Sequence, residues 1–436
     1  MIYVLYGIVL WLALPVIVAY HWWRSVSRGR PAALAPRFGF VHPEELAPLK
    51  NSEVIWVHSV SVGETIAVEP LLRALKKRWP HRKIVLSTMT ETGREVAGKI
   101  AEADCLLYFP FDYRFAVMRL LRLVNPSLII IVETEIWPHF LRHARMRSIP
   151  VVMVNGRISD RSARRYFTFR WFFRPVLDMV NAFCMQSGED SRRIASIGAE
   201  PARVHVTGNL KYDIPVVRLN TTERSEMRAS YSIPADALVF TAGSTHGGED
   251  EAVAEAFSAV AATMPGLVLV IAPRHPERTG TVADILTHRG IPFRLRSKLD
   301  AERVPLAPGE ALLVDTVGEL KRLYSVSDVV FVGGSLVPTG GHNVLEPAAF
   351  GVPVLFGPHM SNFREISAAL LEHGGGIQIA DGAALEKELH SLCADKERRL
   401  AVGDNGMEWL RGSSGSVARH MDVIAQVMDG SKRQRL

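Results

Sequence analysis

Cysteine is scarce in this sequence: among 436 residues it occurs only at Cys105, Cys184 and Cys393. These three residues lie far apart in the chain, and none belongs to a Cys-x-x-Cys pair. A disulfide framework and a cysteine zinc site are therefore both disfavoured, and a reducing compartment fits the composition best.

Motifs of metal and nucleotide chemistry are also missing. The sequence has no Asp-x-Asp metal–nucleotide motif, no Gly-Lys-Ser/Thr P-loop and no His-Glu-x-x-His zinc motif. Four histidines in the second half show no regular ligand spacing: His246, His275, His342 and His359. We therefore expect no catalytic metal and no cofactor.

Charge and composition are ordinary for a globular protein. Hydrophobic residues make up 48% and charged residues 22% of the chain, and the formal net charge is +6. This length is too great for one hydrophobic core and indicates about two or three domains. The modest basic excess is compatible with a membrane surface, a phosphorylated substrate or nucleic acid, and does not choose among them.

The N-terminus carries the one long apolar run. Residues Ile2–Tyr20 contain no charge and nearly cross a hydrocarbon core of roughly 30 Å. Two tryptophans and a basic flank follow: Trp22, Trp23, Arg24, Arg28 and Arg30. Because cationic flanks stay on the cytoplasmic side, we expect a single-pass inner-membrane anchor with the remaining chain in the cytoplasm.

Two other readings of this segment stay open. A cleaved signal peptide would need positive charge before the apolar stretch and an Ala-x-Ala site, and the apolar segment Ile2–Tyr20 offers neither. The segment could also form an interfacial hairpin kinked at Pro15.

From residue 54 onward, short β-branched runs alternate with helix-length amphipathic stretches such as Thr65–Trp79 and Trp137–Arg147. Expected strands in the first half are Val54–His58, Ile84–Thr88, Leu106–Phe109, Leu128–Val132, Val151–Asn155, Phe183–Gln186 and Val204–Thr207. Those in the second half are Leu238–Ala242, Leu267–Ala272, Leu312–Val314, Val329–Val332 and Val354–Phe356. Such continuously apolar strands are covered on both faces, so we predict an α/β protein with two doubly wound, Rossmann-like domains facing across a cleft.

A polar stretch at Tyr212–Pro234 interrupts the alternation. We therefore expect an anchor and basic flank at residues 1–30, an N-terminal domain at 31–212, a linker at 213–236 and a C-terminal domain at 237–436.

In the first half, three strand ends carry candidate chemistry. Glu64 lies where a strand meets a helix and could act as a general base, or could simply be an acidic residue of a helix's first turn. Glu133 and Glu135 follow an apolar strand and are costly there unless solvated, paired or used. Lys211 could hold a phosphate or carboxylate at a hinge, although most loop lysines are only solvated.

In the second half, loops that follow strands carry Gly, Ser, Arg and His. Arg274 supplies a fork of donors for a phosphate, and Glu346 could accept ribose hydroxyls. The glycines at Gly333 and Gly334 let the backbone approach a phosphate. Several such loops within one domain predict a nucleotide site.

Arginines and aromatic residues are concentrated between Arg157 and Arg174. This pattern suits a bilayer interface, where Arg164, Arg165 and Arg170 would meet lipid phosphates. An ordinary helix with one buried aromatic face explains it equally well. Nucleic acid is disfavoured, because no DNA- or RNA-binding motif accompanies the cluster.

Several segments resemble the 3-deoxy-D-manno-octulosonic acid (Kdo) transferases of lipopolysaccharide synthesis: VHSVSVGET, STMTETGRE, ETEIWP, NGRISDRS, GNLKYD, PRHPER, DTVGEL and FVGGSLVPTGGHNVLEPAAFGVPVLFGP. The resemblance runs from about residue 56 to 363, and HNVLEPAAFGVPVLFGP resembles GT-B glycosyltransferases more widely. It implies an inverting, metal-independent GT-B enzyme that moves Kdo from CMP-Kdo to lipid IV-A, with acceptor binding in the N-terminal domain and nucleotide-sugar binding in the C-terminal domain.

Matched motif by motif, the resemblance implies that Glu64 is the proton acceptor and that Glu133 and Lys211 stabilise the transition state. It also implies that CMP is held by Pro273, Arg274, Val317, Gly318, Glu319, Asn343, Val344, Leu345 and Glu346.

Two other functions are left open by the residues. Another GT-B enzyme could use a different nucleotide sugar on a membrane acceptor, and a non-catalytic membrane-bound nucleotide sensor would bind CMP without forming product.

Overall fold

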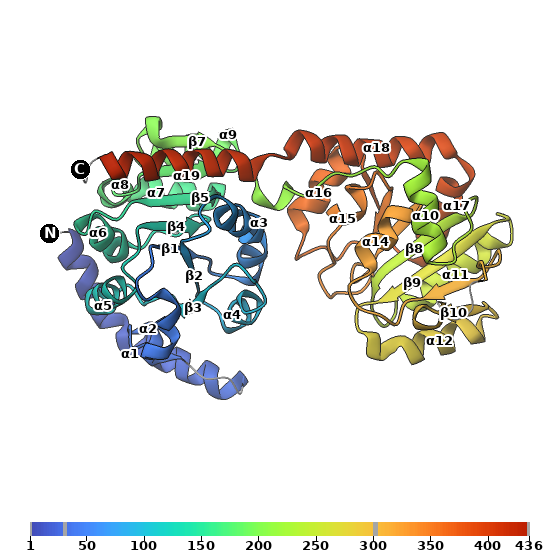
Figure 1. The fold of residues 1–436 in the computed structure, drawn as a ribbon, viewed down its shortest axis with the longest axis horizontal. Coiled ribbons are helices and arrows are strands. Elements are labelled where there is room, and N and C mark those ends of the chain that lie inside the picture. The colour runs from blue at the N-terminus through green and yellow to red at the C-terminus, as the bar shows by residue number, and fades with distance from the viewer. Residues whose placement is uncertain (1, 29–32, 300–303, 434–436) are drawn as a thin grey trace. The chain divides into compact units, whose positions relative to one another are not determined.

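The computed structural model describes residues 2–28, 33–299 and 304–433. The chain divides into two compact units: Met1–Asp213 together with Gly415–Leu436 (the first unit), and Ile214–Ser414 (the second unit). Each unit contains a parallel seven-stranded sheet with helices around it, so the predicted pair of doubly wound α/β domains is confirmed (Figure 1).

The sheet of the first unit has the order β3-β2-β1-β4-β5-β6-β7. Its strands are β1 (Val54–His58), β2 (Lys83–Thr88), β3 (Cys105–Tyr108), β4 (Leu128–Val132), β5 (Val151–Gly156), β6 (Ala182–Met185) and β7 (Val204–Val206). Its helices are α1 (Ile2–Arg28), α2 (Leu34–Arg37), α3 (Val62–Arg78), α4 (Glu91–Ala97), α5 (Arg114–Val124), α6 (Pro138–Met146), α7 (Asp160–Thr168), α8 (Arg170–Leu177), α9 (Gly188–Ile197) and α19 (Ser416–Arg433).

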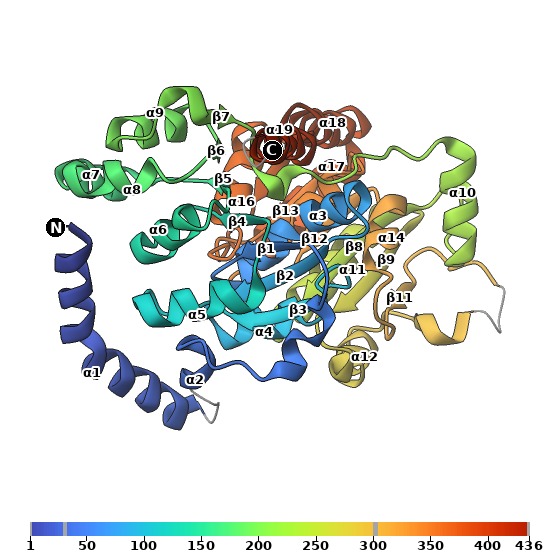
Figure 2. The same cartoon turned by 60° about the vertical axis from the view of Figure 1, so that its left-hand side comes forward.

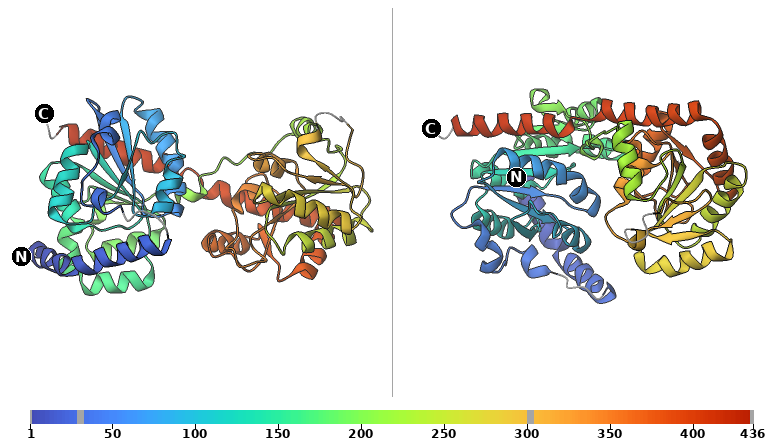
Figure 3. Two further views of the ribbon diagram at one scale, coloured as in Figure 1. Left: turned by 90° about the horizontal axis from the view of Figure 1, so that it is seen from below. Right: turned by 45° about the vertical axis from the view of Figure 1, so that its right-hand side comes forward.

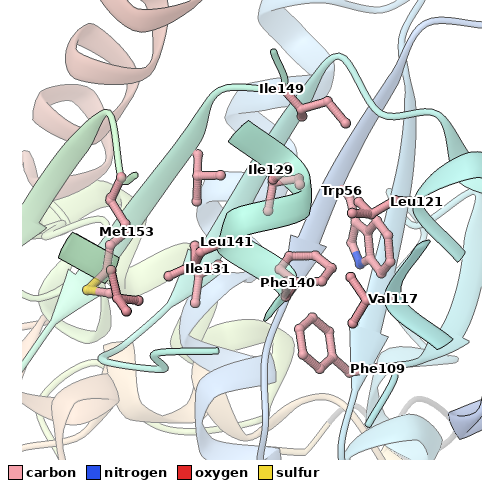
Figure 4. Packing of buried hydrophobic residues seen from close by; sticks show 14 of the residues in the cluster. Trp56, Phe109, Val117, Leu121, Ile129, Ile131, Phe140, Leu141, Ile149 and Met153 are labelled. Atoms are coloured by element: carbon pink, nitrogen blue, oxygen red, sulfur yellow. The ribbon is translucent and has the colours of Figure 1, made fainter. Parts of the chain in front are cut away.

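Both faces of this sheet are buried, which explains why its strands are continuously apolar. Along β1, Val54 and Trp56 point into one hydrophobic cluster, whereas Ile55 and Val57 belong to the cluster on the opposite face. Figure 4 shows the first cluster, in which Trp56 packs against Phe140 with ring centroids 5.2 Å apart. Because side chains alternate along each strand, helices pack against both faces of the sheet.

The sheet of the second unit has the order β10-β11-β9-β8-β12-β13-β14. Its strands are β8 (Leu238–Thr245), β9 (Leu267–Pro273), β10 (Phe293–Leu295), β11 (Ala311–Leu313), β12 (Val329–Val332), β13 (Val354–Phe356) and β14 (Gly376–Gln378). Its helices are α10 (Thr221–Ser230), α11 (Asp250–Ala261), α12 (Thr279–His288), α14 (Leu320–Val326), α15 (Leu345–Ala348), α16 (Arg364–Glu372), α17 (Gly382–Ala394) and α18 (Lys396–Ser413).

The predicted strands agree with the observed ones to within a few residues at each end. The two strands that the sequence did not reveal, β10 and β14, are three-residue edge strands without a β-branched run. The stretch predicted as a linker contains helix α10, which begins with a capping box formed by Asn220 and Glu223. Reciprocal hydrogen bonds at this N-terminus stabilise the helix, which the polar composition of the segment did not predict.

The C-terminal helix α19 packs in the first unit, on α3, β5 and β6 (Figure 1; Figure 3, right). This differs from the sequence-based division, which placed every residue after 236 in the second domain. The physical reason is the apolar face of α19, because Val423, Ile424 and Met428 join the hydrophobic cluster on one face of the first sheet. The amphipathic pattern of a helix predicts that one face packs on a hydrophobic core, but it does not predict which domain provides that core.

Helix α1 is the one helix, within the described residues, that is long and apolar enough to cross a membrane by length and composition. It lies along the first unit past α5 and α6 (Figure 2). The Tyr6 hydroxyl donates to Asp112 at 3.0 Å, and the Leu10 carbonyl accepts from the Tyr113 hydroxyl at 2.6 Å. Its other side is exposed. Arg30 of the predicted basic flank lies outside the described residues, as do the side chains of Arg24 and Arg28.

Candidate active site

Each sheet has a point where the chain changes its direction of winding. In the first unit β2 and β3 extend the sheet on one side of β1, and β4 then pairs with the other side. In the second unit β9 and β12 likewise flank β8. Loops diverge at the carboxyl ends of such neighbouring strands, and ligands of open α/β sheets bind there. Glu64 follows β1 and Glu133 follows β4, so both lie at this switch point in the first unit.

Glu64 occupies the first turn of α3. Its Oε2 accepts a hydrogen bond from the Val60 backbone nitrogen at 2.7 Å, and its Oε1 accepts from the Ser61 hydroxyl at 2.9 Å. Ser61 is the N-cap residue and accepts in turn from the Glu64 backbone nitrogen. The carboxylate therefore stabilises the helix terminus, as the simpler reading of the sequence proposed, and this does not exclude a chemical role.

The environment of Glu64 favours its protonated form. The residue is buried, at 8% exposure, and burial raises its pKa above the usual range. The hydrogen bond from Val60 opposes this rise, while the charge of Glu133 adds to it. The charge of Lys211 acts in the opposite direction and lowers the pKa. The structure thus brings the three predicted catalytic residues within electrostatic reach of one another.

Glu133 has a left-handed backbone conformation, with φ of 60°. Its backbone nitrogen donates to the Val154 carbonyl at 2.8 Å, which anchors the residue to the end of β5. For a residue other than glycine this conformation is uncommon and costs free energy, and such strain concentrates at functional sites. The turn places a carboxylate directly at the carboxyl edge of the sheet.

Glu135 belongs to the same acidic group but was not assigned a role from the sequence. Burial raises its pKa to about 7, and the charges of Glu64 and Glu133 contribute to that rise. A carboxyl group that titrates near neutral pH suits acid–base chemistry. The signal in the sequence was its position two residues after Glu133, but sequence position does not show how far the protein environment shifts the pKa of either acid.

Lys211 lies in the short helical turn Leu210–Tyr212, whose N-cap is Asn209. The Asn209 side chain accepts from the Lys211 backbone nitrogen at 2.9 Å. One residue earlier, the Leu210 backbone nitrogen donates to the side chain of Asn155 at 2.9 Å. Since Asn155 is the penultimate residue of β5, these bonds tie the loop of Lys211 to the sheet edge that carries Glu133.

The predicted nucleotide residues of the second unit follow three parallel strands. Pro273 ends β9, and the exposed Arg274 comes directly after it. After β11, Val317 is 82% exposed and Gly318 has φ of 90°. Glu319 accepts from Arg296 Nε at 2.8 Å, and this bond helps to outweigh the effect of burial, so that the pKa of Glu319 lies below its usual value.

The segment Asn343–Glu346 runs from the preceding loop into the first turn of α15, whose N-cap is Val344. The Asn343 side chain accepts from the Leu345 backbone nitrogen at 3.1 Å and donates to Glu346 at 3.2 Å. Val344 and Leu345 are buried, so a nucleotide could meet only their backbone. Burial raises the pKa of Glu346 above its usual range.

The glycine loop after β12 does not offer its amides to an external phosphate, in contrast to the sequence-based expectation. The fully buried Glu249 accepts hydrogen bonds from the backbone nitrogens of Gly334, Ser335 and Leu336 at 2.7, 2.9 and 2.9 Å. The loop therefore binds a carboxylate of its own chain. Phosphate binding must then depend on other groups at this sheet edge.

No group of three His, Cys, Asp or Glu side chains is arranged to hold a metal ion within residues 2–28, 33–299 and 304–433. The three cysteines are free and buried.

Comparisons with known proteins give consistent results. A family model described as "3-Deoxy-D-manno-octulosonic-acid transferase (kdotransferase)" matches residues 32–214. The chain is 36% identical over 403 residues to a 3-deoxy-D-manno-octulosonic acid transferase of Haemophilus influenzae, covering 91% of each chain. It is 32% identical over 415 residues to a transferase of the same name from Bordetella pertussis, covering 92% of this chain and 94% of the other.

Among solved structures, the UDP-GlcNAc 2-epimerase from Neisseria meningitidis bound to UDP-GlcNAc has the same two-sheet fold. The TM-score is 0.54 at 15% identity, covering 86% of this chain and all of the other. At this identity the likeness concerns the fold alone.

Proposed function

The chain belongs to the Kdo transferases, glycosyltransferases of lipopolysaccharide synthesis, and we propose that it moves Kdo from CMP-Kdo to lipid IV-A with inversion and without a metal ion. The observation that carries this proposal is the group of Glu64, Glu133 and Lys211 at the switch point of the first sheet. These three residue types supply a base, a carboxylate and a cation to one place.

Glu64 is proposed as the general base. As the acceptor hydroxyl oxygen forms its bond to C2 of Kdo, the hydroxyl proton passes to the Glu64 carboxylate. The bond from C2 to the phosphate oxygen breaks, and its electron pair leaves with CMP. A raised pKa makes Glu64 a stronger base than an exposed glutamate, which suits a hydroxyl donor.

Glu133 and Lys211 are proposed to stabilise the charges that develop. Positive charge on the sugar ring is stabilised by a carboxylate held in place before the reaction, and the left-handed turn at Glu133 provides such a fixed position. The ammonium of Lys211 can offset the carboxylate of Kdo or the departing phosphate. Glu135 lies in the same electrostatic network and shares in its titration.

The second unit is proposed to bind CMP through the strand-end loops of Arg274, Val317–Glu319 and Asn343–Glu346. Arg274 and Val317 are exposed and could contact a ligand directly. The side chains of Glu319 and Asn343 already hold hydrogen bonds within the chain, so contact with CMP would use their remaining capacity or their backbone.

Membrane contact is proposed to involve α1 and α8 together. Tyr6 of α1 meets Phe172 of α8 with ring centroids 6.0 Å apart, so the two helices adjoin. In α8 and the preceding α7 segment, Phe167, Phe169 and Trp171 are at least half exposed, and Arg164, Arg165 and Arg170 are exposed as well. Aromatic and arginine side chains at one surface suit the headgroup region of a bilayer, where the acceptor lipid resides.

The contacts of α1 favour a helix that lies along the membrane surface over one that crosses it. They extend from Tyr3, against His139, to His21, against Phe111. At 1.5 Å per residue this is about 27 Å, close to the thickness of the hydrocarbon core. A crossing helix with these contacts would draw α5 and α6 into the hydrocarbon.

One experiment tests the proposed reaction. Purified protein is incubated with CMP-Kdo and lipid IV-A in the presence of a chelator, and the lipid product is examined by mass spectrometry. We expect a mass increase of one or more Kdo residues. Activity with a UDP-sugar and none with CMP-Kdo would instead support another GT-B reaction, and CMP binding without any product would support a nucleotide sensor.

A further inference from the structure

The side chains of His246 and His342 form a hydrogen-bonded pair at the switch point of the second sheet. Their Nε2 atoms are 2.9 Å apart, and their ring planes differ by 10°. His246 follows β8, and His342 lies in the loop between β12 and α15. A third ring, His275 after β9, stands perpendicular to His246 with centroids 5.9 Å apart. Three strand ends thus each contribute one imidazole.

The chemistry of imidazole limits the protons that this pair can hold. One Nε2 must donate and the other must accept, so the shared bond contains a single proton. In the neutral pair the accepting ring carries its own proton on Nδ1. One further proton taken up by the pair has to reside on the other Nδ1, and both Nδ1 atoms are then donors. Within the described part of the chain neither Nδ1 has a hydrogen-bond partner, and both residues are partly exposed. Once it has taken up that proton, the pair can therefore donate an N–H from each Nδ1 atom.

The charged groups around the pair leave a place for an anion. Arg274 is exposed, whereas Arg278 is paired with Asp250 and also donates to the Thr245 carbonyl at 3.2 Å. The carboxylate of Glu249, whose charge acts on His246, is taken up by backbone nitrogens, including that of His246 at 2.9 Å. Burial and the charge of Arg274 lower the pKa of His342 to about 4, and burial also lowers that of His246. Without an anion the pair is neutral at pH 7.

Because Glu249 occupies the amides of Gly334, Ser335 and Leu336, we consider the side-chain donors at this edge, which include those of Arg274, His246, His275 and His342. We propose that His246 and His342, with His275 beside them, bind the phosphate of the nucleotide and take up a proton from solvent as they do so. This inference rests on the proposed CMP-Kdo donor. When the bond to C2 breaks, the phosphate passes from a diester to a monoester and gains about one negative charge at neutral pH. The added proton offsets that charge.

The test is a proton count during CMP binding. Full-length protein in detergent micelles is titrated with CMP at pH 7.5, in buffers of different ionisation enthalpy, by isothermal titration calorimetry. At this pH the CMP phosphate is largely ionised, since its second pKa is about 6. We expect uptake of about one proton per CMP, because the pair has room for one, and no uptake with cytidine, which lacks the phosphate.

Two variants and one control sharpen the test. His246→Gln and His342→Gln should bind CMP on the order of tenfold more weakly, with proton uptake close to zero. His390→Gln, an exposed histidine of α17, should behave like the wild type. If the wild type binds CMP without taking up a proton, the inference is wrong, whether or not the variants fold. Full proton uptake by folded variants would also contradict it. Absence of CMP binding by the wild type would instead contradict the donor itself.

Discussion

The Nε2 atom of His420 lies 3.0 Å from the backbone nitrogen of Asn155, although the two residues are 265 positions apart. His420 is fully buried in α19, and its Nδ1 lies 2.8 Å from the Ser416 carbonyl. Nδ1 therefore donates, and Nε2 accepts from Asn155. The side chain of Asn155 in turn holds the loop of Lys211. The C-terminal helix thus supports a loop of the candidate active site.

Replacing His420 should distinguish a role in positioning the Lys211 loop from a role in packing alone. We expect His420→Ala to lower the free energy of unfolding by about 2–3 kcal/mol, since it leaves buried groups without partners. Turnover should fall while CMP binding is unchanged, because the residues proposed to bind the nucleotide lie in the second unit. Thermal unfolding measures the loss of stability, kcat measures the loss of turnover, and calorimetry measures CMP binding. His390→Ala, at an exposed histidine, is the control. Unchanged turnover in a folded variant would remove His420 from any role in positioning Lys211.

The same histidine predicts a pH dependence of stability. Burial lowers the pKa of His420 to about 4 in the folded state, below the ordinary value of about 6.5. The unfolded chain therefore binds more protons in this range. The contribution of His420 is complete above about pH 6.5 and is lost as the pH falls toward 4. Denaturant titrations between pH 4 and 7 should show a shallower decline for His420→Gln than for the wild type.

For Glu64, two substitutions distinguish the chemical role from the helix cap. Glu64→Gln keeps an oxygen that can accept from the Val60 nitrogen, whereas Glu64→Ala loses it. We expect both variants to lose transfer by at least about a hundredfold, with only Glu64→Ala also losing about 1 kcal/mol of stability. CMP binding should survive in both. Near-normal turnover of Glu64→Gln would exclude it as the base.

The pH–rate profile should report the acidic group. Since the base must be ionised, kcat/KM should rise with pH through the raised pKa of Glu64. Removing a neighbouring negative charge by Glu133→Gln should lower that pKa and move the acidic limb toward lower pH. The profile of the wild type, measured on the same substrates, is the reference. An acidic limb that stays in place, or moves to higher pH, would contradict coupling between these carboxylates.

The arginines beside α8 predict a charge-dependent attachment to membranes. In a chain truncated to begin at residue 29, replacing Arg164, Arg165 and Arg170 by alanine should weaken binding to anionic vesicles by about fivefold per residue, from about 1 kcal/mol each. Three exposed arginines of the second unit, Arg289, Arg322 and Arg411, provide a control with the same change of charge. Equal partitioning of the two triple variants would show that only net charge matters.

Much of the fold was accessible from the sequence because strand and helix signals are local. The apolar run Leu128–Val132 and the Ser61–Glu64 turn have recognisable patterns, and the structure confirms the predicted strand and a helix start there. The short edge strand β14 has no such pattern, because pairing with β13 rather than its own residues makes it a strand. Glu64 and Glu133 could be singled out because they directly follow strands, although their catalytic roles stay a proposal.

Sequence pattern alone was enough to place the candidate residues at the ends of parallel strands, since periodicity and strand ends are properties of neighbouring residues. Only the folded chain decided that α19 packs on the first unit, that Glu249 occupies the glycine loop, and that Glu135 titrates near pH 7. Each of these depends on contacts between distant residues and on the burial that such contacts create. Burial and proximity set the free energy of a charge, and neither can be read from one stretch of chain.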